Sequence, residues 1–167
     1  MLVKQSALAV TFGVLLVLLV APPARAETVH HRDARGDAPS AIDIRSVDYS
    51  HGLQRVRVKA DIPDLGSSGS AALSISRFTV FEAGYVIQIK KRAGTSAKAR
   101  LYYFDHFDLE PRRCSSVSGR WGARQIKLAV ARRCLDSHAR NRVFVQFGIQ
   151  RGRTVDRAPA VRRLARG

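Results

Sequence analysis

Apolar and polar residues alternate along much of this chain, and the alternation predicts β-strands. The clearest run covers residues 53–62, where Val56, Val58, Ala60 and Ile62 alternate with arginine, lysine and aspartate. A period of two places the aliphatic side chains on a core face and the charged ones in water. Further runs predict strands at residues 42–49, 72–81, 85–90, 99–104, 112–117, 124–131 and 143–149.

Turn-forming residues separate these runs roughly every eight to twelve residues, a spacing typical of β-sandwiches. Residues 63–66 (Pro-Asp-Leu-Gly) end the second strand, residues 82–84 suit a hairpin turn, and residues 119–122 suit a turn around Trp121. The chain shows no long amphipathic helix pattern and no internal repeat. The sequence therefore predicts an all-β fold, an antiparallel sandwich of the jelly-roll or immunoglobulin-like type with about seven or eight strands.

The first 26 residues have the three parts of a secretory signal peptide. Lys4 supplies a positive region, residues 8–20 are largely apolar, and Ala24-Arg25-Ala26 is a small-x-small cleavage pattern. The apolar run of about 13 residues is shorter than the roughly 20 that span a bilayer. An uncleaved anchor is the alternative. We expect an exported, extracellular chain that loses residues 1–26 and keeps no transmembrane span.

Composition divides the rest of the chain into three parts. Residues 27–40 are polar and rich in turn formers, which predicts a mobile leader. Residues 41–153 carry the strand patterns and form the expected sandwich domain. Residues 154–167 are basic and contain alanine and proline, which predicts a frayed C-terminal tail.

The chain has two cysteines, Cys114 and Cys134. In an exported chain, two cysteines most simply form one disulfide. Closing a loop of about 21 residues stabilises the fold by roughly 3 kcal/mol in the chain-entropy model. A free, metal-binding or catalytic pair is the alternative, but the spacing does not match a redox Cys-x-x-Cys motif.

The chain is strongly basic, with 29 Lys and Arg residues, 13 Asp and Glu residues and a formal charge of +16. Removal of the signal peptide takes away Lys4 and Arg25 and no acid, so the mature charge is +14. Such a charge favours acidic partners such as wall polymers, anionic lipid or nucleic acid. A bias toward arginine from GC-rich coding is the alternative explanation.

Two sets of basic residues are candidates for contact with a polyanion. Each cysteine follows an Arg-Arg pair, so a disulfide would gather four guanidinium groups, and the strand at residues 53–62 adds an outward basic row. Together the two sets comprise Arg112, Arg113, Arg132, Arg133, Arg55, Arg57 and Lys59. An anionic extracellular or cell-wall polymer would bind if these rows share a sheet face. Otherwise they are solvated surface. Because no RNA- or DNA-binding motif accompanies them, nucleic acid ranks below envelope polymers.

A set of residues at fixed spacings resembles the sequence pattern of a known family. Asp33-x-x-Gly36-Asp37 is followed by Asp43-Ile44-x-x-Val47, and later by Cys114, Cys134-Leu135, Val143, Val145 and Asp156. The pattern is similar to secreted bacterial β-sandwich domains related to DOMON and family 9-like carbohydrate-binding modules, over roughly residues 33–156. The resemblance implies a sandwich that binds sugars, or in some branches haem or other redox cofactors, often with a structural calcium.

Carried onto this chain, the resemblance implies calcium ligands at Asp33, Asp37, Asp43 and Asp156. The alternative is that Asp37 and Asp43 cap turns and flank a strand. No haem ligand is recognisable, so no cofactor other than calcium is expected. Trp121 and Tyr102 are candidates for stacking on a sugar, although core or edge packing is the commoner role of each.

The sequence contains no convincing catalytic motif. Residues 105–110 (Asp-His-Phe-Asp-Leu-Glu) bring three carboxylates and an imidazole together, but a strand end explains the same letters. We expect a secreted, non-enzymatic binding module for cell-envelope or extracellular polysaccharide. The first alternative is a basic surface protein that adheres electrostatically to anionic wall polymer or lipid, and the second is a small secreted hydrolase.

Overall fold

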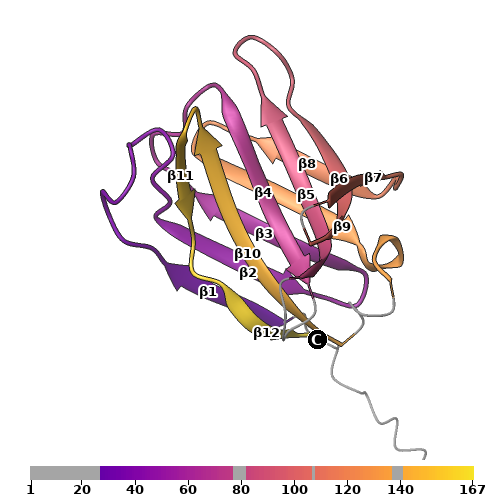
Figure 1. The fold of residues 1–167 in the computed structure, drawn as a ribbon. Coiled ribbons are helices and arrows are strands. Elements are labelled where there is room, and N and C mark those ends of the chain that lie inside the picture. Colours follow the sequence, from indigo (N-terminus) through magenta and orange to yellow (C-terminus); the bar gives the residue numbers. More distant parts are fainter. Residues whose placement is uncertain (1–26, 77–81, 107, 137–140) are drawn as a thin grey trace, which may run out of the picture.

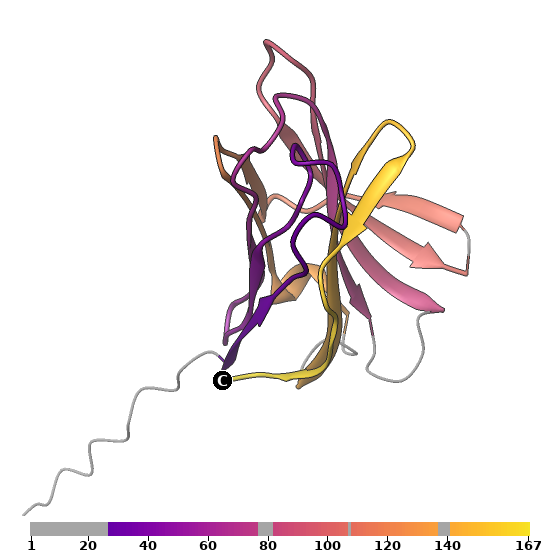
Figure 2. The ribbon, with the colours of Figure 1, turned by 90° about the vertical axis from the view of Figure 1, so that its left-hand side faces the viewer.

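Two antiparallel β-sheets packed face to face form the part of the chain that the computed structural model describes, residues 27–76, 82–106, 108–136 and 141–167. Figure 1 shows one sheet in front of the other, and Figure 2 shows the two layers from the side. This architecture confirms the predicted all-β sandwich. The expected signal peptide lies outside the described residues. Within them, no helix has the length and apolarity that a membrane crossing requires.

Sheet A contains five strands in the order β1-β2-β3-β9-β8. Its central strand, β3, pairs with β2 on one side and β9 on the other, and Val58 lies opposite Tyr49 and Leu128. Apolar side chains at every second position of these strands are buried against sheet B. The strands are β1 (Glu27–Arg32), β2 (Ser46–His51), β3 (Arg55–Asp61), β8 (Val117–Trp121) and β9 (Gln125–Ala131).

Sheet B follows the order β11-β10-β4-β5-β6-β7, and β12 also pairs with β10. Its inward positions include Leu73, Ile87 and Phe147, which are fully buried between the layers. The core therefore consists of the alternating aliphatic positions of both sheets. The strands are β4 (Gly69–Ser76), β5 (Ala83–Lys91), β6 (Lys98–Asp105), β7 (Asp108–Arg112), β10 (Arg142–Arg151), β11 (Thr154–Arg157) and β12 (Val161–Ala165).

The two ends of the chain differ from the prediction, because both contribute strands. Glu27–Arg32 forms β1 on the edge of sheet A instead of a mobile leader, and the expected basic tail contains β11 and β12. The long strand β10 explains the second difference, because its free edge needs hydrogen-bond partners along its length. β11 covers one end of that edge and β12 covers the other.

Tyr49 joins the layers where β10 changes partner from β11 to β12. Its buried hydroxyl accepts a hydrogen bond from the backbone N–H of Phe147 at 2.9 Å and donates one to the carbonyl of Pro159 at 3.1 Å. The carbonyl of Phe147 in turn accepts from the N–H of Ala158 at 3.1 Å. Burial raises the pKa of Tyr49 well above its usual range, so the hydroxyl keeps its proton.

Several predicted boundaries also shift. The strand expected at residues 72–81 is Gly69–Ser76, and Phe78 and Val80 lie outside the described residues. Ala83 and Gly84 belong to β5 rather than to a hairpin turn, and Trp121 ends β8 instead of forming a turn. The strand expected at residues 112–117 is wrong, because β7 ends at Arg112 and Cys114 follows in a loop.

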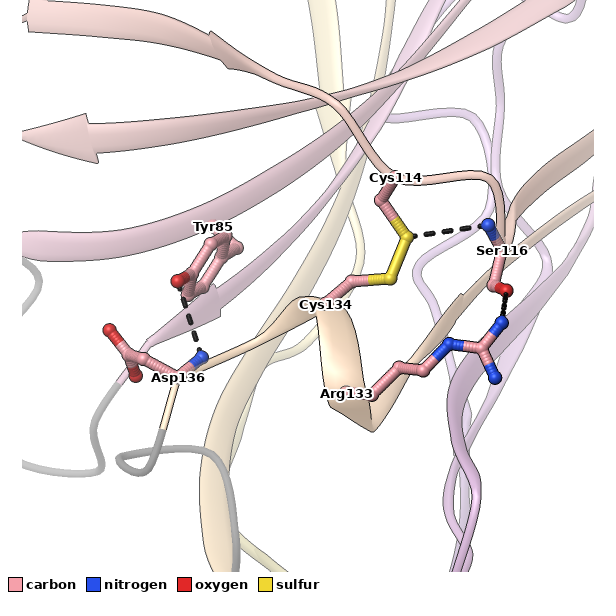
Figure 3. The surroundings of a disulfide bond; sticks show 6 residues. All are labelled: Tyr85, Cys114, Ser116, Arg133, Cys134 and Asp136. Carbon is pink, nitrogen blue, oxygen red and sulfur yellow. Dashed lines mark hydrogen bonds between the residues drawn. A yellow bond between two sulfur atoms is a disulfide. The ribbon is translucent and has the colours of Figure 1, made fainter.

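The predicted disulfide between Cys114 and Cys134 is confirmed, with Cα atoms 5.9 Å apart. Cys114 lies where the chain leaves sheet B for β8, and Cys134 ends a short 3-10 helix, η1 (Arg132–Cys134), that follows β9. Figure 3 shows the bond beside Tyr85, whose hydroxyl accepts from the N–H of Asp136 at 3.2 Å. The disulfide therefore fixes the two connections that link the sheets at this edge.

Candidate functional site

The outward face of sheet A carries a compact basic patch. Strand alternation turns Arg57 and Lys59 of β3 into solvent, and the same alternation exposes Lys127 of β9 and Arg120 of β8. The side chain of Arg55 is half-buried at the start of β3. We define the sheet A patch as Arg55, Arg57, Lys59, Arg120 and Lys127.

Three cations of the sheet A patch lie in one cross-strand row. Lys59 is opposite Lys127, and Lys127 is opposite Arg120. Directly opposed residues on one sheet face have Cβ atoms about 4.5–5.5 Å apart, and like charges at that spacing destabilise the sheet. The acid adjoining this row is Asp48, whose carboxylate lies 3.7 Å from the Lys59 ammonium and 2.6 Å from a His30 ring nitrogen. Within the described residues, Lys127 and Arg120 have no acidic partner.

A hollow of about 520 Å³ lies beside this row. Its floor is formed by small outward residues of neighbouring strands, because Ser50 lies opposite Arg57, and Ala129 lies between Arg57 and Ser118. Small floor residues beneath long cationic side chains leave space for a chain to lie across the strands. Besides the cations of the sheet A patch, the acidic residue Asp48 also lines this hollow.

The arginines beside the cysteines have different partners. Arg132 and Arg133 lie at the end of the sheet A face and share a hollow of about 410 Å³ with Arg55. The guanidinium of Arg132 donates to the carbonyl of Leu53 at 3.0 Å, and that of Arg133 donates to the hydroxyl of Ser116 (Figure 3). These two residues extend the sheet A patch.

Arg112 and Arg113 lie on the sheet B side of the disulfide. Arg112 belongs to β7 of sheet B, where its guanidinium lies 5.1 Å from the ring centre of Tyr103 and 3.3 Å from the carboxylate of Glu110. Arg113 is exposed in the loop after β7. The disulfide brings the backbones together, but the side chains follow the sheets from which they come.

An acidic cluster lies between the β1–β2 connection and β11. Asp37, Asp43 and Asp156 each place a carboxylate oxygen within 4.8 Å of the others. Asp43 and Asp156 are 3% and 5% exposed, so their charges are largely removed from water. The structure therefore brings together three of the four aspartates that the resemblance implied as calcium ligands.

Backbone groups and one cation hold this cluster in place. Asp43 accepts from the N–H of Gly36 at 3.2 Å and pairs with the guanidinium of Arg45 at 3.1 Å. Asp156 accepts from the N–H of Ile44 at 2.8 Å, a contact that ties β11 of sheet B to the segment before β2. Desolvation by burial raises the pKa of Asp156, and the carboxylates of Asp37 and Asp43 add to that rise.

Asp33, the fourth aspartate, adjoins the cluster. Its Oδ1 accepts from the N–H of Ala34 at 3.0 Å, while its buried Oδ2 has no hydrogen-bond partner among the described residues. Burial raises the pKa of Asp33, and repulsion from Asp156 and Asp37 contributes. Hard carboxylate oxygens are the donors that calcium prefers. Asp37, Asp43 and Asp156 therefore offer a donor set that fits the ion that the resemblance implies, and Asp33 is a neighbouring carboxylate outside that set.

The two aromatic candidates have different surroundings. The indole N–H of Trp121 donates to the carbonyl of Gly66 at 2.9 Å, and its ring packs against the core and Gly69. This packing gives Trp121 a structural role and argues against sugar stacking there. Tyr102 lies on the outward face of sheet B and lines a hollow with Arg100 and Gln88. Tyr102 therefore keeps an accessible position, on the opposite side of the molecule from the sheet A patch.

Sequence reasoning missed Arg120 and Lys127. The alternation of residues 124–131 marks Lys127 as outward, whereas Arg120 lies in residues 119–122, which the sequence predicted as a turn and which the structure places largely in β8. Their importance comes from the pairing of β3 with β9 and of β9 with β8, which places them beside Lys59. That pairing joins residues far apart in the chain.

Comparison with known proteins gives no assignment, because no protein-family model, curated protein or solved structure matches this chain.

Proposed function

We propose that this chain is a secreted, non-enzymatic module that adheres through the sheet A patch to an anionic polymer of the cell envelope. The observation that carries the proposal is the row Lys59, Lys127 and Arg120, in which three cations lie opposite one another on adjacent strands. A carboxylate- or phosphate-bearing chain would relieve their mutual repulsion. The hollow beside the row offers it a path across the strands.

Charge supports this function better than aromatic stacking does. The indole of Trp121 is held by packing and a hydrogen bond, and Tyr102 lies on the other sheet. Guanidinium groups bind planar carboxylates and phosphates through paired hydrogen bonds. Binding at the sheet A patch should therefore depend on salt, because exposed charges are screened within roughly 4–5 Å at about 0.5 M salt.

The test is a pull-down of the mature chain on purified cell-wall fractions, with polygalacturonate and teichoic acid as defined carboxylate and phosphate polymers. We expect capture at low salt and its loss by about 0.5 M salt. The triple variant Arg57→Ala, Lys127→Ala, Arg120→Ala should lose most of this capture. The matched control removes three charges from sheet B, through Lys90→Gln, Lys98→Gln and Arg100→Gln, and should keep it.

Other outcomes would contradict the proposal. Equal losses in the two triple variants would mean that net charge alone drives adhesion. Preferential capture by phosphatidylglycerol vesicles or duplex DNA would assign the patch to another partner. Turnover of any glycan or ester in a substrate panel would show that the chain is an enzyme.

A further inference from the structure

The hairpin formed by β5 and β6 carries a second group of cations, on the outward face of sheet B. Its connection, residues 92–97, extends beyond the neighbouring loops at one end of the sandwich, as Figure 1 and Figure 2 both show. A hollow of about 570 Å³ lies beside this connection. Four of the residues that line it are cations, and we define them as the hairpin cluster: Lys90, Arg92, Lys98 and Arg100.

Two lysines lie in the middle of the hairpin cluster. Lys90 of β5 lies opposite Lys98 of β6, and both side chains are exposed. Like charges that face each other directly across two strands destabilise a sheet. Arg100 follows Lys98 by two positions, so it lies on the same face, roughly 6–7 Å farther from the connection. Because Arg92 belongs to the connection itself, the cluster is elongated along the hairpin, with an arginine at each end.

No acidic residue balances these charges in the part of the chain that the structure describes. None of the four cations forms an ion pair with a carboxylate there. On sheet A, by contrast, the carboxylate of Asp48 lines the hollow and lies 3.7 Å from the Lys59 ammonium. The other residues that line the hairpin hollow are uncharged, namely Gln88, Thr95, Ser96 and Tyr102.

The connection beside the hollow is held in shape by its own hydrogen bonds. The backbone N–H of Thr95 donates to the carbonyl of Arg92 at 3.2 Å, and the Thr95 hydroxyl donates to the same carbonyl at 3.0 Å. The ammonium of Lys91 donates to the carbonyl of Thr95. Gly94 has a φ of 73°, a left-handed conformation that glycine adopts without strain. These contacts fix the backbone from which Arg92 and Ser96 line the hollow.

The side chains that line the hollow are donors suited to phosphate oxygens. The guanidinium groups of Arg92 and Arg100 can each direct paired N–H groups at one phosphate, whereas a lysine ammonium acts as a point charge. The hydroxyl of Ser96 has no partner among the described residues and adds a neutral donor. A site with a donor fork at each end and two ammonium groups between them matches an anion with two linked centres of charge.

We propose that the hairpin cluster binds a diphosphate group, in which two phosphate groups are joined directly. Lys90 and Lys98 would stand on either side of the bridge, with Arg92 and Ser96 donating to one phosphate group and Arg100 donating to the other. A terminal phosphate group carries about two negative charges at neutral pH, more than a phosphate inside a diester polymer. A compact ligand therefore brings the cluster more charge in less space than a polymer does. The site is separate from the sheet A patch and does not rest on the function proposed for that patch.

The test is titration calorimetry of pyrophosphate into a chain of residues 27–167, in buffer with EDTA so that no metal ion forms a bridge. We expect binding at one site. Inorganic phosphate and sulfate should bind about tenfold more weakly or worse, because each reaches only one end of the cluster. Adenosine diphosphate and geranyl diphosphate carry the same group on a nucleoside and on a lipid tail. Their affinities relative to pyrophosphate identify the kind of molecule that presents the group.

Three variants separate a defined site from attraction by net charge. Lys90→Gln, Lys98→Gln, Arg100→Gln should weaken the dissociation constant of pyrophosphate about tenfold or more. The matched control Arg57→Ala, Lys127→Ala, Arg120→Ala removes the same charge from sheet A and should change it less than about twofold. Ser96→Ala keeps every charge and should weaken it about two- to tenfold, because one hydrogen-bond donor is lost. Circular dichroism and thermal unfolding check that each variant is folded.

Three results would overturn the proposal: no measurable binding of pyrophosphate by the wild type, equal weakening in the two triple variants, or equal affinity for pyrophosphate and sulfate. The two triple variants should also exchange roles on teichoic acid, where the sheet A variant loses capture and the sheet B variant keeps it. Failure to bind pyrophosphate with teichoic acid capture intact would reject this site alone.

Discussion

Buried polar side chains join the two layers at a small number of residues. Tyr49 lies in sheet A, yet its hydroxyl serves two backbone groups, Phe147 N–H and Pro159 C=O, on the far side of the core. Asp156 crosses in the other direction, from sheet B to the N–H of Ile44. A buried polar group without a partner costs more than a made hydrogen bond contributes. These residues therefore fix how the sheets are placed on each other.

Tyr49→Phe tests this role by removing only the hydroxyl group. The substitution keeps the ring and leaves the buried N–H of Phe147 and the carbonyl of Pro159 without their partner. We expect the free energy of unfolding to fall by about 1–3 kcal/mol, measured by urea denaturation. The control is Tyr102→Phe, which removes a hydroxyl on the outward face and should change stability by less than about 0.5 kcal/mol. Equal effects in the two variants would remove the special role of Tyr49.

The acidic cluster gives a prediction about pH and calcium. Burial raises the folded-state pKa of Asp33 above its ordinary 3.8, so its contribution to stability is complete below that pH. The contribution is lost as the pH rises through the folded-state pKa. Without calcium, Asp33→Asn should therefore gain stability relative to the wild type as the pH rises from about 4 to 7.

With calcium at neutral pH, the wild type should instead be more stable than Asp33→Asn, because calcium binds ionised carboxylates and stabilises the folded chain. We expect 5 mM CaCl₂ to raise the melting temperature of the wild type at pH 7, and to have little effect on Asp33→Asn or at pH 4. Scanning calorimetry against EDTA measures both. An unchanged melting temperature of the wild type would reject the calcium site implied by the resemblance.

Whole strands show which parts of the fold local patterns predict. β3 and β9 were evident from the sequence because their buried aliphatic residues, Val58 and Leu128 among them, fall at every second position, with charged residues between them in β3 and Gln125, Lys127 and Ala129 between them in β9. β1, β11 and β12 were not evident, because their sequence patterns are short and pairing with neighbouring strands determines whether they form strands. The alternation in β1 buries Glu27, Val29 and His31 only partly, so no apolar stripe identifies it.

The residues of the candidate sites likewise fall into those that a local pattern predicts and those that only strand pairing brings together. The sequence predicted that Arg57 and Lys59 point outward, since both lie within one alternating strand. It could not place Lys127 beside Lys59, because strand order and register come from long-range pairing. The sequence predicted a disulfide between the two Arg-Arg-Cys segments but not the contacts of their arginines, since Arg112 lies over the ring of Tyr103 and Arg132 donates to the carbonyl of Leu53.

The disulfide should contribute measurably to the free energy of unfolding, because it joins two connections between the sheets. Cys114→Ser with Cys134→Ser opens the loop between sheet B and the end of β9, which increases the freedom of the unfolded chain. We expect a loss of about 3 kcal/mol in the free energy of unfolding. Urea denaturation of the double variant, compared with the wild type in its oxidised form, gives the value. A loss below about 1 kcal/mol would show that packing alone holds this edge.

At the scale of the whole molecule, both outward faces carry cations, in different arrangements. Sheet A presents a row of like charges on adjacent strands with small residues beside it. On sheet B, the cations lie beside the β5–β6 connection and on β11. The sandwich separates these faces by its apolar core, so a ligand on one does not block the other.

The salt dependence of binding to an anionic polymer tests the central claim most directly. Binding of a chain of residues 27–167 to teichoic acid is measured from 50 to 500 mM NaCl, and the logarithm of the association constant is plotted against the logarithm of salt concentration. We predict that Arg57→Ala, Lys127→Ala, Arg120→Ala lowers the slope by roughly one unit per cation removed. The sheet B control Lys90→Gln, Lys98→Gln, Arg100→Gln should keep the slope of the wild type. A wild-type slope in the sheet A variant, or the same reduction in both variants, would contradict the account.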